Sequence, residues 1–197
     1  MTTARDLAIV VLDVAADKPV EQGDLSLVLA GAEVLDLLDA RALALDGDRI
    51  LPQAPSPTGD RLLDEAAEAL VRQEPYESVE DWLWRRGRGL SAAYVDDLER
   101  AGLTARSRGR RIPLRTGRAE LVDSAARRQA EDRRTAGEPV LAALVSAAGI
   151  GDEPAGELTD EAATVLAAVG DAVMELEAVR QRRVIEDAAF DNVWRGY

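Results

Sequence analysis

The chain has 197 residues, with no cysteine, no histidine and only seven aromatic side chains. These absences exclude disulfides, thiolate nucleophiles, imidazole bases and Cys/His metal sites. No phosphate-binding loop and no serine–lysine arrangement of the penicillin-binding type is present in their place. Paired carboxylates such as Asp96 with Asp97 are adjacent, so on a helix they point about 100° apart and cannot share one substrate atom. The sequence predicts a protein that is not an enzyme and needs no cofactor.

Long hydrophobic runs are also missing. The apolar stretch Leu7–Val14 is interrupted by Asp13, and no run approaches the roughly 18 residues of a membrane-spanning helix. Residues 1–6 lack the basic start and the uninterrupted apolar core of a signal peptide. We therefore expect a cytoplasmic protein that contacts membranes only peripherally, on their cytoplasmic face.

What the chain has in abundance is alanine and leucine, within a hydrophobic fraction of 47%. Both residues favour helices, whereas the aromatic residues that favour strands are scarce. The length fits one domain that buries about 70% of its unfolded surface. We predict a mainly α fold: residues 1–197 form a single, compact helical bundle with two short β-hairpins, at about 43–51 and 103–115.

The hairpins and helices are placed by local signals. Asp46-Gly47 between apolar alternations is a strong hairpin signal, and Gly109 is the expected turn of the second hairpin. A hydroxyl of Ser56 or Thr58 is expected to cap one helix, and Ser78 begins another. Apolar periodicity predicts helices at about 3–14, 25–40, 58–70, 78–84, 90–101, 119–134, 140–148, 159–178 and 184–194.

Charge is distributed unevenly along the chain. The net charge is −13, but residues 85–134 contain fourteen arginines against seven acidic residues, a local +7 that leaves −20 for the remainder. The overall charge argues against a general nucleic-acid binder, since affinity for phosphates depends on accumulated Lys and Arg. The basic segment is the first candidate for a binding surface.

One run of ten residues is more specific than helix periodicity requires. Ser56–Glu65 reads Ser-Pro-Thr-Gly-Asp-Arg-Leu-Leu-Asp-Glu and resembles the signature of the Golgi phosphoprotein 3 family. The likeness continues in the same order along most of the chain, through Leu7–Val14, Gly31, Asp36-Leu37, Trp82 and Leu98–Leu103.

This resemblance implies a compact, mainly helical domain without enzymatic activity. Family members are peripheral membrane adaptors that bind phosphatidylinositol 4-phosphate and, in eukaryotes, the tails of Golgi glycosyltransferases. Because the eukaryotic targeting features are missing, we expect a bacterial member.

The family's head-group pocket uses one tryptophan and three arginines. The corresponding positions here are Glu21, Ala30, Arg88 and Ser91, so only Arg88 matches. A phosphomonoester carries a charge of about −1.5 to −2 and is usually held by several charge-assisted hydrogen bonds. We therefore expect general docking on anionic lipid rather than specific recognition of phosphatidylinositol 4-phosphate.

The second hairpin is apolar and aromatic in the family but rich in arginine here. The predicted contacts with anionic phospholipid head groups are Arg85, Arg86, Arg88, Arg106, Arg108, Arg110, Arg111 and Arg115. Ile112 and Leu114 are expected to make shallow apolar contacts with the membrane at the tip. The resemblance also implies self-association through this hairpin.

Three alternatives remain open on the sequence alone. The arginines are as readily explained by ion pairs with acidic residues of the same chain or of a partner subunit. A protein-binding scaffold would use Trp82, Trp84 and Tyr94 as anchors, although tryptophan at helical spacing usually belongs to a core. A winged-helix DNA binder is disfavoured because the helix at 91–100 has no Asn or Gln to read bases.

Overall fold

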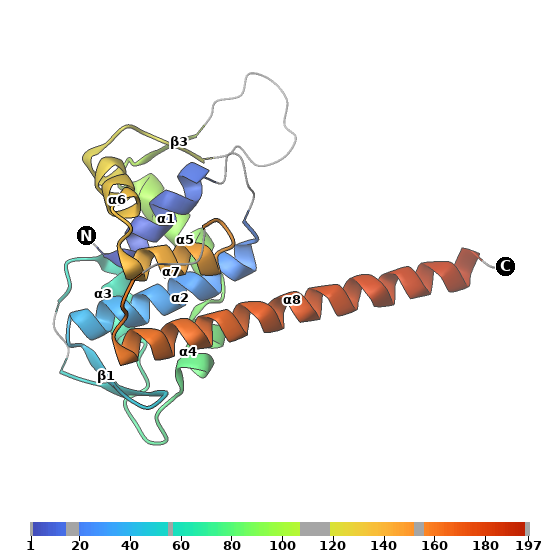
Figure 1. The fold of residues 1–197 in the computed structure, drawn as a ribbon, viewed down its shortest axis with the longest axis horizontal. Helices are drawn as coiled ribbons and strands as arrows, with labels where there is room; N and C mark the ends of the chain where they lie inside the picture. Colours follow the sequence, from blue (N-terminus) through green and yellow to red (C-terminus); the bar gives the residue numbers. More distant parts are fainter. Residues whose placement is uncertain (1, 15–19, 55–56, 107–118, 152–155, 196–197) are drawn as a thin grey trace.

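The computed structural model describes residues 2–14, 20–54, 57–106, 119–151 and 156–195, and Figure 1 shows the course of the chain. The predicted mainly α fold with two short hairpins is confirmed for this part of the chain. Its helices are α1 (Thr3–Val14), α2 (Gln22–Asp39), α3 (Arg61–Glu68), α4 (Val79–Arg86), α5 (Leu90–Arg100), α6 (Ala125–Thr135), α7 (Pro139–Ala147) and α8 (Asp160–Arg195). Its strands are β1 (Leu43–Asp46), β2 (Arg49–Pro52), β3 (Thr104–Arg106) and β4 (Ala119–Leu121).

Helix α2 is the centre of the core. Every residue from Leu25 to Leu37 is buried, and α1, α4, α5 and α8 pack around it. The contact with α8 is especially close, because a Cβ on Gly31 would lie 2.3 Å from the side chain of Val169. Gly31 therefore lets two helix backbones approach, and a larger residue would push α8 away.

The first hairpin forms as the sequence predicts. β1 pairs antiparallel with β2, and Gly47 takes a left-handed conformation (φ +60°) in the turn between them. The second hairpin is wider than predicted, since β3 pairs with β4 at residues 119–121 rather than ending at Arg115. The intervening residues 107–118, including the expected turn at Gly109, lie outside the described residues.

The C-terminal region departs from the prediction of two helices. α8 continues without a break from Asp160 to Arg195, so the predicted interruption near residues 179–183 is wrong. Residues 179–183 contain no Gly or Pro, and the side chains of Arg180 and Gln181 both donate hydrogen bonds to Glu177 in the preceding turn. Helix α6 also begins later than predicted, after Ser124 caps it, because residues 119–121 are in β4.

Candidate functional site

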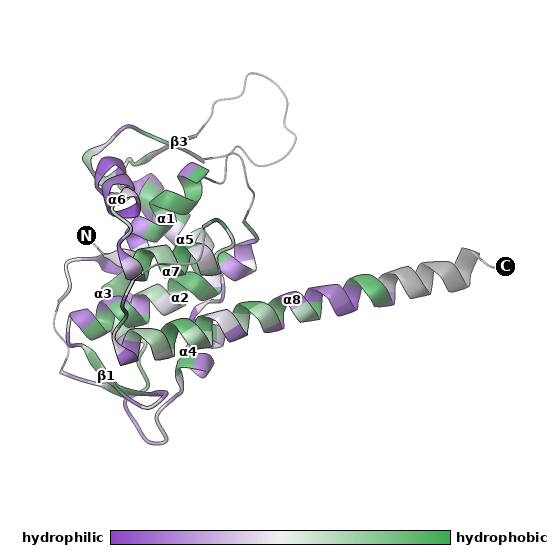
Figure 2. Cartoon of the chain, in the orientation of Figure 1, coloured by the Kyte–Doolittle hydropathy of each residue, from purple (hydrophilic) through white to green (hydrophobic). Residues whose placement is uncertain are grey.

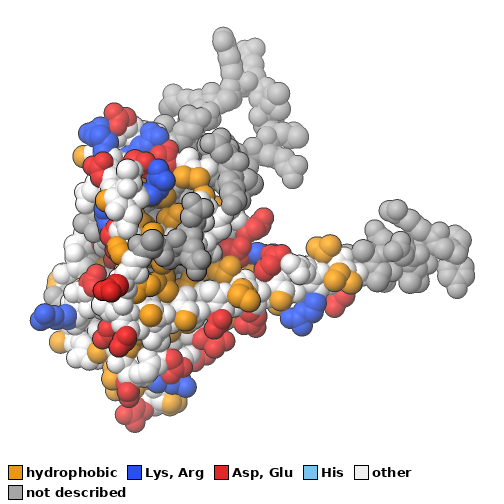
Figure 3. All heavy atoms as spheres, in the orientation of Figure 1, with side chains coloured by type: hydrophobic (Ala, Val, Ile, Leu, Met, Phe, Trp, Pro, Cys, Tyr) orange, Lys and Arg blue, Asp and Glu red, His pale blue; other side chains and the backbone are white. Residues whose placement is uncertain are grey.

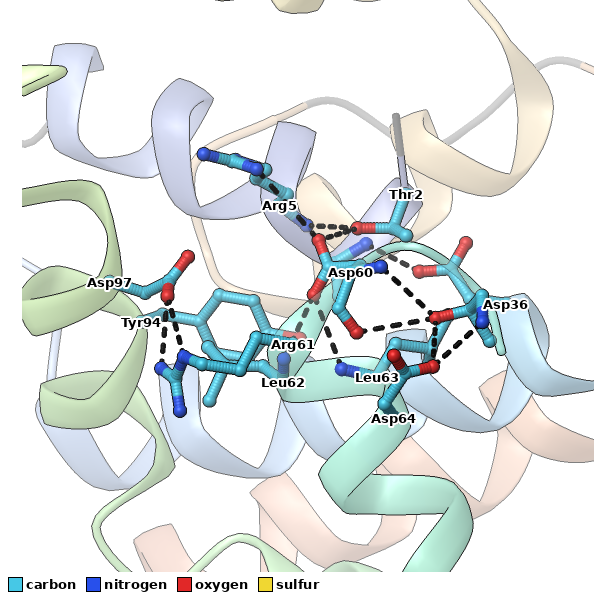
Figure 4. A network of polar contacts seen from close by, with 12 residues as sticks. Thr2, Arg5, Asp36, Asp60, Arg61, Leu62, Leu63, Asp64, Tyr94 and Asp97 are labelled. Atoms are coloured by element: carbon cyan, nitrogen blue, oxygen red, sulfur yellow. Dashed lines mark hydrogen bonds and ion pairs between the residues drawn. The ribbon is translucent and has the colours of Figure 1, made fainter. Parts of the chain in front are cut away.

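The signature run begins helix α3, as Figure 4 shows. The carboxylate of Asp60 accepts hydrogen bonds from the backbone N–H groups of Leu62 (3.0 Å) and Leu63 (3.2 Å), so Asp60 is the N-cap. The prediction of a hydroxyl cap is corrected for Thr58, which instead bonds Asp64 through its hydroxyl and its N–H, each at 2.7 Å. Asp60 lies two residues nearer the helix than Thr58, and its carboxylate takes the capping position. Ser56 lies outside the described residues.

The remaining polar contacts of the signature join α3 to its neighbours. Asp60 accepts from the hydroxyl of Thr2 (3.3 Å) and lies 4.0 Å from the guanidinium of Arg5, both at the start of α1. Arg61 binds Asp97 on α5 at 2.9 and 3.1 Å. The signature therefore connects three helices, and its polar groups are engaged in structural bonds.

Loss of the Asp60 cap is expected to destabilise the fold measurably. Asp60→Ala should lower the free energy of unfolding by about 1–2 kcal/mol, because two N–H groups at the start of α3 lose their acceptor. Asp60→Asn keeps one acceptor oxygen and should have a smaller effect. Asp48→Ala, at an exposed carboxylate, is the matched control in urea unfolding and should change stability by less than about 0.5 kcal/mol. Equal effects at the two sites would contradict this role of Asp60.

Two of the predicted lipid-binding arginines are paired inside the domain. Arg86 makes two parallel bonds to the fully buried carboxylate of Glu33, at 2.8 and 2.9 Å, and a third to the carbonyl of Leu62. Tyr94 donates its hydroxyl to the same carboxylate at 3.2 Å. Burial raises the pKa of Glu33, and the bonds from Arg86 and Tyr94 act against that increase.

Arg85 is the second of these arginines. Its guanidinium binds the carboxylate of Glu77 and the carbonyl of Ala69, and it lies 5.2 Å from the ring centre of Trp82. Pairing with acids of the same chain thus accounts for Arg85 and Arg86. Trp82 is fully buried and donates its ring N–H to Ala30, and Tyr94 is buried as well, so these two aromatic residues belong to the core.

Unlike Arg85 and Arg86, Arg88 lines a pocket of about 290 Å³. Its side chain is exposed and forms no ion pair with the residues that the structure describes. Trp84 and Leu176 supply apolar walls, while Ser91, Gln22 and Gly23 add polar and backbone groups. The structure thus brings together the two predicted positions Arg88 and Ser91.

The pocket also lies at the starts of two helices. At α2, which begins at Gln22, and α5, which begins at Leu90, the preceding residue supplies no side-chain cap, although the hydroxyl of Ser26 accepts the N–H of Ser91 at 3.1 Å. Helix N-termini carry partial positive charge and favour anions. Together with Arg88 they give this pocket a polarity suited to a small anionic group.

The other two aligned positions do not join the pocket. Ala30 is completely buried within α2, and Glu21 is an exposed residue that precedes α2. Sequence reasoning did not place Gln22 and Leu176 at this pocket and named Trp84 only as a protein-binding anchor, because these residues come from three separate helices and carry no shared motif.

The two strands of the second hairpin, β3 and β4, lie at the opposite end of the domain from α4, as Figure 1 shows. β3 and β4 are next to α1 and α5, whereas α4, with Arg85 and Arg86, packs on α2 and α8. For Arg106 only the backbone is described, in β3. The predicted lipid contacts Arg108, Arg110, Arg111 and Arg115 and the tip residues Ile112 and Leu114 lie outside the described residues.

Charges on the described surface are largely balanced or acidic. Figure 3 shows acidic side chains spread along α8, and basic and acidic side chains interleaved at the end that holds α6. There, Arg128 pairs with Asp123 at 2.7 Å and Arg134 with Glu131 at 2.6 Å. A groove of about 390 Å³ between α2, α7 and the start of α8 is lined by four acidic side chains, Asp39, Glu138, Glu157 and Glu161.

Over the described ranges, no group of three or more acidic side chains is placed to hold a metal ion. No helix in these ranges is both long and apolar enough to cross a membrane.

Comparison with known proteins gives one result. Residues 4–188 match the family model for Golgi phosphoprotein 3 (GPP34). No curated protein matches the chain.

Proposed function

Because this chain belongs to the Golgi phosphoprotein 3 family, we propose that it is a non-enzymatic adaptor that docks reversibly on anionic lipid from the cytoplasmic side. The observation that carries the proposal is the contrast between its arginines. Arg85 and Arg86 are paired with acidic side chains of the domain. Residues 106–118 contain six arginines and no acidic residue.

Electrostatics gives this segment enough attraction for reversible docking. Each basic residue close to an anionic leaflet contributes about 1 kcal/mol, and the attraction falls off within a Debye length. Ile112 and Leu114, within the same segment, add shallow apolar contacts. The acidic remainder of the chain, with a charge near −20 outside residues 85–134, favours an orientation in which it stays in solution.

The Arg88 pocket is a separate anion site in this proposal, since it lies at the start of α5, whereas β3 follows the end of that helix. It offers one unpaired guanidinium and two helix starts, which suit one anionic oxygen group. Tight binding of a phosphomonoester usually needs several charge-assisted hydrogen bonds. The pocket therefore suits small anionic groups in general, without strong preference for an inositol phosphate.

Vesicle co-sedimentation tests the docking segment. The native protein should bind phosphatidylcholine vesicles that contain phosphatidylserine at low salt, and binding should weaken as salt is raised. The triple variant Arg108→Glu, Arg110→Glu, Arg111→Glu should bind at least roughly a hundredfold more weakly, since three contributions of about 1 kcal/mol are lost and three repelled charges are added. Vesicles that carry phosphatidylinositol 4-phosphate at matched charge should bind no more tightly.

The control carries the same charge change elsewhere. Arg41, Arg49 and Arg72 are exposed and lie on or near the first hairpin, away from β3 and β4, and their joint reversal to Glu should leave most binding intact. Equal losses in both triple variants would show that net charge alone governs binding. Absence of binding to anionic vesicles at low salt would exclude the proposal, and binding to random duplex DNA in a gel shift would favour a nucleic-acid partner instead.

A further inference from the structure

The C-terminal part of α8 extends beyond the domain body, as Figure 1 shows. The inner side of the helix packs on the core through Val165, Val169 and Ala172, all buried. Further along, Arg180 donates two hydrogen bonds to the carboxylate of Asp24 on α2, at 2.7 and 2.9 Å. Residues 181–186 are all exposed, and the helix continues to Arg195. A lone helical segment of this length is only marginally stable in water.

The outer side of α8 carries an apolar stripe. The apolar Met174, Ala178 and Ile185, with the polar Gln181 between the last two, follow one another at intervals of four, three and four residues, so they lie on one face. Met174 is 71% exposed and Ile185 67%, and Val184 beside the stripe is also 67% exposed. Figure 2 shows the hydrophobic patch on the projecting part of the helix. Large apolar side chains exposed in a row on one helix are typical of an interface.

The charges beside this stripe change sign along the helix. Asp171 and Glu175 lie on one flank of the stripe before its midpoint, Arg182 lies on the same flank after it, and all three are exposed, while the exposed Glu186 lies further round the helix. Two copies of this helix aligned in parallel would place acids against acids and arginines against arginines. Two antiparallel copies place Arg182 of each copy against Glu175 of the other.

We propose that α8 pairs in antiparallel fashion with α8 of a second copy of this chain. Met174 of each copy then lies level with Ile185 of the other, and the small Ala178 lies level with Gln181. Arg182 comes beside Glu175 of the second copy. The interface is two-fold symmetric, and since the body covers only the inner side of each helix, the two bodies lie at opposite ends of the pair.

Disulfide trapping tests both the pairing and its direction, because the native chain has no cysteine. Met174→Cys and Ile185→Cys are made as separate chains and oxidised mildly, each alone and in an equal mixture. The antiparallel pair predicts that the mixed 174–185 cross-link dominates, whereas each variant alone cross-links slowly, since its two cysteines lie eleven residues apart along the pair. Glu80→Cys, at an exposed position on α4, measures cross-linking by random collision.

Two other outcomes of the cross-linking experiment would contradict the proposal. Rapid cross-linking of either variant alone would mean a parallel pair and would overturn the proposal. Mixed cross-linking no faster than for Glu80→Cys would also overturn it, even if the protein self-associates through its second hairpin.

Sedimentation equilibrium of the cysteine-free chain gives an independent measurement. Ile185→Glu should weaken dimerisation at least tenfold, with the helix content checked by circular dichroism. Arg182→Glu should also weaken it, and addition of Glu175→Arg should restore it, because the charge exchange is preserved in an antiparallel pair. Failure of the second change to restore dimerisation would contradict the proposed alignment.

Discussion

Arg86→Met is expected to lower the free energy of unfolding by about 3–5 kcal/mol. The reason is that the substitution leaves the Glu33 carboxylate without its charged partner. This carboxylate is fully buried, and Arg86 supplies two of its hydrogen bonds. Without the guanidinium, Glu33 either stays charged in an apolar core or takes up a proton, and both lower the stability at neutral pH. Urea unfolding at neutral pH measures the change.

Two further variants separate this effect from the loss of an arginine as such. Arg134→Met removes an exposed guanidinium that pairs with Glu131 three residues away, and it should cost about 0.5 kcal/mol or less. Glu33→Gln combined with Arg86→Met removes both charges and should recover part of the stability lost in Arg86→Met alone. If Arg86→Met and Arg134→Met had similar effects, the buried pair would not stabilise the core in the way described.

Arg86 also shows why the sequence assigned these arginines to a lipid surface. Its partner Glu33 is 53 positions away, and nothing near Arg86 in the sequence indicates an acidic partner. Arg127 and Asp13, which bond at 2.6 Å across 114 positions, illustrate the same difficulty. A run of arginines predicts a basic surface only where the fold brings no acid to it, and contacts between distant helices decide that.

Features set by local chemistry were predicted well. Ser78 caps α4 with a reciprocal bond to Asp81, and Asp46-Gly47 forms the turn of the first hairpin. Both depend on side chains within a few residues of the backbone that they shape. The predicted break in α8 failed for a related reason, since the polar residues 180–183 break the apolar periodicity but still favour helix.

The candidate site falls between these cases. Arg88 and Ser91 could be placed together from the sequence because they are three residues apart, close to the start of α5. The apolar walls of the pocket, Trp84 and Leu176, are known only from the packing of α4 and α8 on α2.

Asp36 is expected to make the stability of the fold depend on pH between about 4 and 7. Its buried carboxylate accepts the N–H groups of Thr3 (2.7 Å) and Ala4 (2.9 Å) at the start of α1. Burial nevertheless raises the pKa of Asp36 from 3.8 to about 6, against the effect of these bonds. The contribution of Asp36 is therefore fully present below about pH 4, where the folded and unfolded chains are both protonated, and it is lost as the pH rises through about 6.

The loss amounts to about 3 kcal/mol, since each unit of pKa difference corresponds to about 1.4 kcal/mol. Asp36→Asn cannot titrate, so the stability of the native chain relative to this variant should fall by that amount between about pH 4 and pH 7 in urea unfolding. Asp39→Asn is the matched control, because Asp39 is exposed and its charge only adds to the increase in the pKa of Asp36. The control should keep the pH dependence and shift its midpoint slightly downward. A relative stability that instead rises with pH would mean that the two N–H groups and the start of α1 hold Asp36 ionised despite its burial.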